Sequence, residues 1–113
     1  MIATVTAPQT TIISLAGHID AASAMDLKDQ LAKTVSSDTR PAILVDMERV
    51  EFLDSAGLMA LVSAFSLAQR LGRKFGLCAV SPAIRMIFEL TQLDRAFEIF
   101  DNRHAFETAL SIA

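Results

Sequence analysis

Residues 45–58, VDMERVEFLDSAGL, are the stretch of this sequence from which the fold can be inferred most directly. The apolar run that leads into this stretch is typical of a strand covered on both faces, and we expect that strand to end near Asp46. A short polar connection should follow. Asp54 and Ser55 should then open an amphipathic helix that extends to Leu71. The stretch therefore predicts a strand, a loop and a helix in succession.

Similar alternation of strand-like and helix-like patterns extends over the whole chain. Strands are predicted over 2–5, 11–15, 42–45, 75–80 and 97–100, and helices over 22–35, 56–71, 82–91 and 103–112. This order predicts an α/β fold in one domain over 1–113, with a mixed, mostly parallel sheet of about five strands and about four helices. The first two strands flank a turn-prone segment, so an alternative for them is a hairpin at one side.

Signals for helix ends support these boundaries. Ser23 followed three residues later by Asp26 resembles a capping box at the start of the first helix. Gly72 fits the end of the second helix, and Pro82 fits the first turn of the third.

Composition limits the class of protein. The 113 residues are 52% apolar and carry a net charge of −3, which indicates a globular chain and makes nucleic acid an unexpected partner. The closest basic cluster, Arg70, Arg73 and Lys74, suits the end of a helix. No apolar stretch is long enough to cross a bilayer and no signal peptide is recognisable, so we expect no membrane insertion and a cytoplasmic location.

Metal and cofactor sites are not expected. Cys78 is the only cysteine and lies in an apolar run, so it is interpreted as a buried hydrophobic side chain, consistent with a reducing cytoplasm. One cysteine and two distant histidines, His18 and His104, make no zinc cluster. The four glycines are isolated and form no phosphate-binding loop, which predicts a phosphate acceptor and not an ATP-binding protein. The five methionines are interpreted as core residues.

Ser55 is the main candidate for function, and two interpretations of it remain open. In the first, its hydroxyl caps the helix and does nothing more. In the second, it is exposed and accepts a phosphate, which would meet the N–H groups and the positive end of the helix dipole. Gly57 in the first turn would allow close approach. A phosphate beside Asp54 would repel a partner that bound the uncharged surface.

A second candidate is the segment Gly17-His18-Ile19-Asp20, which is predicted to follow a strand and precede a helix. Asp20 is interpreted either as a helix cap after a turn glycine or as a binding residue at the same sheet edge as Ser55.

Together these motifs resemble the anti-sigma-factor antagonists of the STAS domain family, over nearly the whole of 1–113. The family's central signature is matched by residues 52–58, FLDSAGL, and its Gly-x-Ile/Leu-Asp by residues 17–20. Asp46 matches an aspartate at the end of the preceding strand. The segments CAVSPAI (78–84) and LDRAFEIF (93–100) are similar to later parts of the family pattern. Ala56 stands where many members have a second serine, which leaves Ser55 as the acceptor.

The resemblance implies a non-enzymatic phosphorylation switch. The unphosphorylated form would bind an anti-sigma factor serine kinase and free a sigma factor, phosphorylation of Ser55 would release the kinase, and a serine phosphatase would reset the protein. Asp20, Asp54, Ser55, Ala56 and Gly57, with the exposed side of the following helix, would form the binding surface.

Two other classes of protein are alternatives. A constitutive STAS scaffold subunit of a transporter or signalling assembly would use the same fold without phosphorylation. A serine hydrolase fits poorly, because Leu53 stands where a nucleophile elbow requires glycine.

Overall fold

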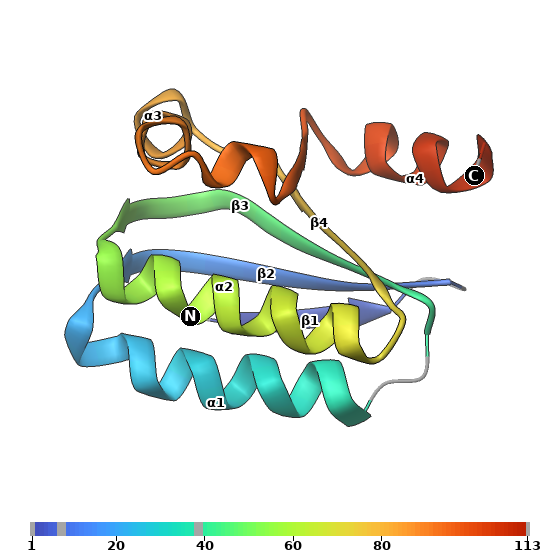
Figure 1. The fold of residues 1–113 in the computed structure, drawn as a ribbon, viewed down its shortest axis with the longest axis horizontal. Coiled ribbons are helices and arrows are strands. Elements are labelled where there is room, and N and C mark those ends of the chain that lie inside the picture. The colour runs from blue at the N-terminus through green and yellow to red at the C-terminus, as the bar shows by residue number, and fades with distance from the viewer. Residues whose placement is uncertain (1, 7–8, 38–39, 113) are drawn as a thin grey trace.

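The computed structural model describes residues 2–6, 9–37 and 40–112 as one α/β unit (Figure 1). Its elements are β1 (Ile2–Thr6), β2 (Thr10–Ile19), α1 (Ala21–Ser37), β3 (Ala42–Leu53), α2 (Ser55–Arg70), β4 (Lys74–Cys78), α3 (Pro82–Leu90), the 3-10 turn η1 (Leu93–Arg95), β5 (Glu98–Phe100) and α4 (Arg103–Ile112). The strands lie in the order β1-β2-β3-β4-β5. The β1–β2 pair is antiparallel and the other three pairs are parallel.

The predicted fold class and element order are confirmed, and the first two strands form the hairpin. In the described chain, no helix is long and apolar enough to cross a membrane. The short turn η1 was not predicted.

The lengths predicted for β2 and β3 are wrong. The strand β3 continues through Asp46 to Leu53, so the expected polar connection is its second half, and Asp46 lies within the strand. Here Met47, Val50 and Leu53 are buried, while the four residues between them are exposed. This half-buried pattern differs from the continuous apolar run that marks a fully covered strand.

The segment Gly17–Ile19 likewise belongs to β2 instead of a following loop. Register shifts against β3 occur between Ser14 and Ala16 and between Gly17 and His18. Gly17 has a φ of +82°, a conformation that favours glycine and accompanies the irregular pairing.

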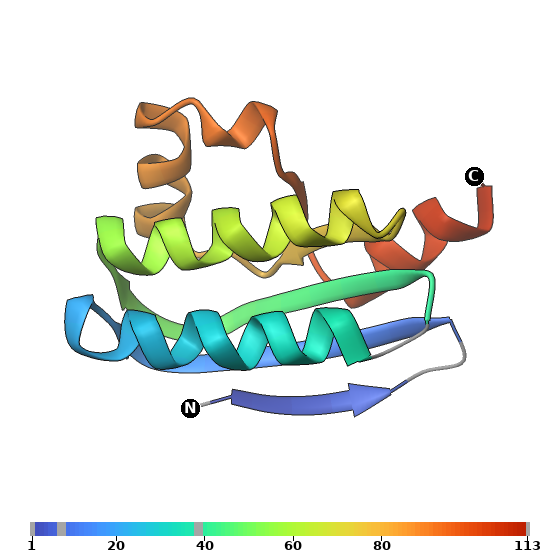
Figure 2. The ribbon, with the colours of Figure 1, turned by 60° about the horizontal axis from the view of Figure 1, so that its bottom comes forward.

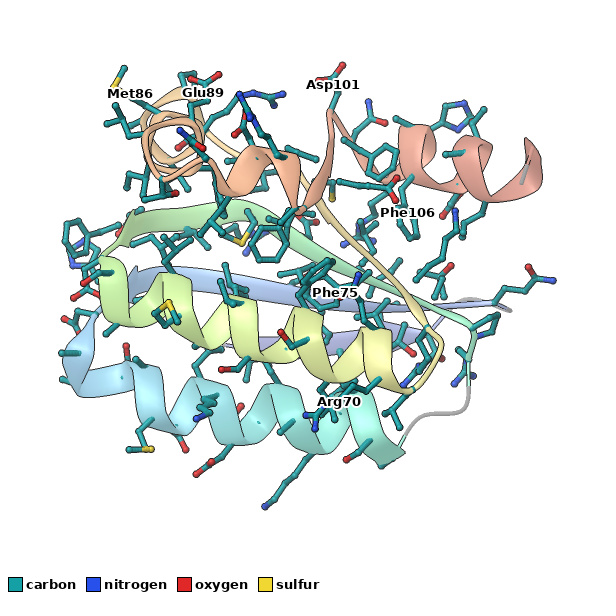
Figure 3. The ribbon with its side chains drawn as sticks, in the orientation of Figure 1. Arg70, Phe75, Met86, Glu89, Asp101 and Phe106 are labelled. Carbon is teal, nitrogen blue, oxygen red and sulfur yellow. The ribbon has the colours of Figure 1, made fainter. Side chains whose placement is uncertain are left out.

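Helices cover both faces of the sheet. The larger core lies on the face covered by α1, α2 and α3, and Figure 2 shows α1 and α2 side by side along the sheet. A smaller cluster on the other face includes Cys78 and Phe106 and lies under α4. Figure 3 shows Phe75 and Phe106 in these two layers. Two cores on opposite faces explain why the first half of β3 is apolar on both sides.

The ends of α2 are well defined by hydrogen bonds. After the last helical residue, Gly72 has a φ of +70°, its N–H donates to the Gln69 carbonyl at 3.0 Å, and the Arg73 N–H donates to the Ala68 carbonyl at 2.9 Å. These two bonds form a Schellman motif, which confirms Gly72 at the helix end. The Arg73 guanidinium donates to the main-chain carbonyls of Val35 and Arg40, so this cation stabilises the C-terminal end of α1 and the segment after it.

Candidate functional site

The site begins at one edge of the sheet, where β2 leads into α1 and β3 leads into α2. Ser55 is the first residue of α2 and is exposed. The residue that caps this helix is Asp54, whose Oδ1 accepts the Gly57 N–H at 3.0 Å. The interpretation of Ser55 as the cap is therefore wrong, because extended Asp54 occupies that position. Within the described chain the Ser55 hydroxyl makes no hydrogen bond, so it stays accessible at the surface.

Asp54 joins the starts of two helices. Its Oδ2 accepts the Ala21 N–H at 3.1 Å, 33 residues away in sequence, while its own N–H donates to the Ile19 carbonyl at 3.1 Å. The carboxylate thus stabilises the positive ends of α1 and α2 together. This arrangement holds Ser55 at a fixed place beside the start of α1.

Asp20 caps α1, as one of its two interpretations predicted. Its Oδ1 accepts the N–H groups of Ala22 and Ser23 at 3.0 and 3.3 Å, and Ser23 Oγ accepts the Asp20 N–H at 3.1 Å. The reciprocal pair is therefore Asp20 with Ser23, and the predicted pair of Ser23 with Asp26 is wrong. The Asp26 carboxylate instead accepts a bond from Gln30 at 2.9 Å. Asp20 and Asp54 place two carboxylates near Ser55.

Gly57 is buried and sets how closely α2 approaches the end of β2. A Cβ there would lie 2.7 Å from Ile19 Cγ2, 2.7 Å from Leu53 Cδ1 and 2.9 Å from the Ile19 carbonyl oxygen. Only a hydrogen atom fits in this space. Gly57 thus positions Ser55 from beneath, and Ala56 beside it is half-buried.

Three methionines on three different helices are exposed, which the sequence did not reveal. Met25, Met59 and Met86 are 71%, 57% and 58% exposed, so the interpretation of the methionines as core residues holds only for Met47 among those described. Met59 lies one helical turn after Ser55 on the same side of α2. Its position in the helix could have predicted the exposure of Met59, since this residue immediately follows the buried Leu58 and falls outside the apolar stripe.

The remaining candidates lie elsewhere. Asp46 faces α4 and is 8% exposed; its Oδ2 accepts bonds from Arg103 Nε and Nη2 at 3.3 and 3.2 Å. Cys78 is buried as predicted, and desolvation, followed by the nearby Asp46 carboxylate, raises the pKa of its thiol to about 11.

The two histidines are exposed, and neither is hydrogen-bonded to Ser55 in the described chain. His18 pairs with Glu51 at 3.6 Å and packs edge-on against Phe52, and His104 lies on α4. In the chain as described, no bond links either ring to Ser55.

Comparison with known proteins identifies the family. The model of the STAS domain matches residues 1–106. The anti-sigma-F factor antagonist RsfB of Mycobacterium tuberculosis is 32% identical over 95 residues, covering 82% of this chain and 75% of that protein.

Solved structures show the same fold. The crystal structure of an anti-sigma factor antagonist from Mycobacterium paratuberculosis superposes with a TM-score of 0.87 at 28% identity, over 96% of this chain and 92% of that one. The unphosphorylated anti-sigma factor antagonist SpoIIAA superposes with a TM-score of 0.81 over 100% and 99% of the two chains, and at 18% identity this likeness concerns the fold alone.

The protein therefore has a STAS domain. Within that class, the chain belongs to the family of anti-sigma factor antagonists.

Proposed function

We propose that this protein is a phosphorylation-controlled switch: its unphosphorylated form binds a kinase-type anti-sigma factor and frees a sigma factor, and phosphorylation of Ser55 releases the kinase. The observation that carries the proposal is the state of the Ser55 hydroxyl, which is exposed at the start of α2 while Asp54 does the capping. A kinase can reach this hydroxyl without breaking a helix cap. An anti-sigma factor as the partner is inferred from the names of the relatives, and kinase chemistry and a cytoplasmic setting are inferred from the family resemblance.

The first turn of α2 can receive a phosphate. The N–H groups of Ser55 and Ala56 have no intrahelical acceptor, because the first backbone hydrogen bond of α2 runs from the Leu58 N–H to the Asp54 carbonyl. The helix dipole also favours a negative charge there. A phosphoserine at this place thus has local donors and needs no refolding of the chain.

The same phosphate would oppose a docked partner. It adds about −1.5 to −2 charges beside the carboxylates of Asp20 and Asp54. The surrounding surface includes the exposed apolar side chains of Met25 and Met59, which a partner would cover. Placing a dianion at such an interface carries a desolvation penalty, and a 100-fold loss of affinity corresponds to about 2.7 kcal/mol.

In this scheme Ser55 is the acceptor, Asp20, Asp54 and Ala56 shape the surface, and buried Gly57 positions it from below. The antagonist itself supplies no catalytic group. The kinase supplies the phosphoryl transfer, and a separate serine phosphatase returns the protein to the binding form.

The test uses purified protein as bait in lysate of the source cell. Wild type and Ser55→Ala should retain a kinase-like protein, whereas Ser55→Asp and bait phosphorylated on Ser55 should lose it. Ser37→Asp is the matched control, because it adds the same charge to an exposed serine at the opposite end of α1. It should retain the partner.

Equal retention of one partner by all baits, the phosphorylated one included, would contradict the switch. That result would favour the alternative of a constitutive scaffold subunit that docks independently of Ser55.

A further inference from the structure

A second surface feature lies further along α2, where this helix faces α1. A groove of about 350 Å³ runs between the two helices. Lys28 of α1 and Arg70 of α2 lie at its walls, Ser63 and Ser66 supply hydroxyl groups, and Ala32 and Leu67 are among its apolar residues. Figure 3 shows Arg70 beside α1, at the end of α2 far from Ser55. The groove is therefore separate from the hydroxyl of the switch.

The charge of this groove is one-sided. Its lining contains two cations and no acidic residue. Within the described part of the chain, neither Lys28 nor Arg70 takes part in an ion pair, and the hydroxyls of Ser63 and Ser66 make no hydrogen bond. Unpaired cations beside unused hydroxyls are suited to carboxylate groups.

The groove lies on the same side of α2 as Ser55. Residues Ser55, Met59, Ser66 and Arg70 are spaced at 4, 7 and 4 residues along α2, which places them on one side of the helix. Arg70 is 15 residues beyond Ser55, so the two lie about 22 Å apart along the axis. One partner helix or extended segment is long enough to span both.

We propose that this groove binds an acidic segment of the anti-sigma factor, with its carboxylates at Lys28 and Arg70. The proposal rests on the proposed function for the partner's identity. It assigns opposite electrostatic tasks to the two ends of one surface. The basic residues attract the partner and fix its orientation, while the Ser55 end becomes more negative on phosphorylation and decides whether the partner stays.

The ligand chemistry is tested without the partner, with a blocked hexaglutamate peptide as the probe and amide NMR as the readout. Addition of the peptide to ¹⁵N-labelled protein should shift the amides of Lys28, Ala32 and residues 62–70. Lys28→Gln/Arg70→Gln should weaken binding at least about 5-fold, since both charge contacts are lost. The matched control is Lys33→Gln/Arg85→Gln, which removes the same charge from exposed positions outside the groove. The control should leave the affinity nearly unchanged.

Absence of peptide-induced shifts in the groove would overturn the proposal. Equal weakening by the control pair would also overturn it, because binding would then follow net charge alone. The spectrum of each variant without peptide shows whether its fold is intact.

The same two pairs of substitutions, introduced into the bait, then test the partner. Lys28→Gln/Arg70→Gln should retain less of the kinase-like protein than the control pair, and equal retention would contradict the groove's role. Ser55→Asp lies about 22 Å along α2 from Arg70, which is about two Debye lengths, so it should weaken peptide binding less than Lys28→Gln/Arg70→Gln does. Failure of the groove proposal and failure of the switch are thus distinguishable. If only the groove proposal fails, the Ser55 baits still differ in how much partner they retain. If only the switch fails, the peptide still binds in the groove.

Discussion

At the scale of single residues, Gly57 is the position at which the smallest change should have a large effect. Gly57→Ala places a methyl group within 2.9 Å of the Ile19 carbonyl oxygen, which is backbone and cannot rotate away. Overpacking of this kind costs about 1–3 kcal/mol, against about 1 kcal/mol gained from helix propensity. Because three atoms lie closer than 3.0 Å to that Cβ, we expect the upper part of the overpacking range, about 2–3 kcal/mol, and so a net destabilisation of about 1–2 kcal/mol in urea unfolding.

Ser66→Ala, on the exposed side of the same helix, is the control and should change stability by less than about 0.5 kcal/mol. A Gly57→Ala protein as stable as wild type would show that α2 can shift away from β2 at no cost.

Cys78 should be chemically inert in the folded protein. Burial raises the pKa of its thiol from 9.0 to about 11, and only the thiolate reacts readily with disulfide reagents. We expect no reaction with such a reagent at pH 8 until a denaturant unfolds the chain. Rapid labelling of the native protein would contradict the buried position.

The same thiol predicts a pH dependence of stability. Above pH 9 the unfolded chain loses the thiol proton first, while the native state keeps it until about pH 11. The native state then binds more protons, so the thiol's contribution to the free energy of unfolding falls between these values. Cys78→Ala should lose less stability over this interval than wild type, as measured by urea unfolding at each pH.

At the scale of secondary structure elements, Asp54 is the residue that couples two helices. Asp54→Ala removes acceptors for the N–H groups of Gly57 and Ala21 at once. Since each lost capping bond costs about 0.5–2 kcal/mol, we expect about 1–4 kcal/mol of destabilisation in total and faster hydrogen exchange in the first turns of both α1 and α2. Asp26→Ala, which loses only an exposed bond from Gln30, is the control. Faster exchange in α2 alone would contradict the coupling.

Helix α4 is attached to the sheet by one ion pair and a small apolar cluster. Arg103→Ala leaves the Asp46 carboxylate, 8% exposed, with only the Glu48 N–H donor at 3.0 Å among the described contacts. We expect about 1–3 kcal/mol of destabilisation and faster hydrogen exchange in α4. Arg95→Ala, at an exposed site in η1, should have little effect. Unchanged exchange in α4 would show that Phe106 packing alone holds it.

At the scale of the whole molecule, phosphorylation should change charge and leave the fold as it is. Ser55 is exposed and Asp54 already fixes the helix start, so the phosphate displaces no core side chain. We expect amide shifts on phosphorylation to be confined to residues 54–58 and the adjoining start of α1. Large shifts throughout β3 and β4 would show a rearrangement and contradict this prediction.

The order of elements was predictable because it depends on local periodicity. The Pro82 start of α3 and the bounds of α4 agree with the sequence prediction, as does Gly72 after α2. The full length of β3 was not predictable, because the buried Met47, Val50 and Leu53 are three residues apart at the register shifts and break the alternation that marks a strand. The interpretation of Ser55 as the cap was wrong because two adjacent residues can both cap, and the extended backbone at Asp54 decides between them.

By itself, the sequence determined the α/β class, the element order, and a candidate serine at the start of a helix, because each depends on residues close together in the chain. The tertiary structure decided which contacts these residues make. It brought Asp54 to Ala21 across 33 residues and Asp46 to Arg103 across 57, and it placed Lys28 and Arg70 in the lining of one groove. Such pairings depend on how α1, α2 and α4 pack on the sheet, and packing is settled by the whole core at once.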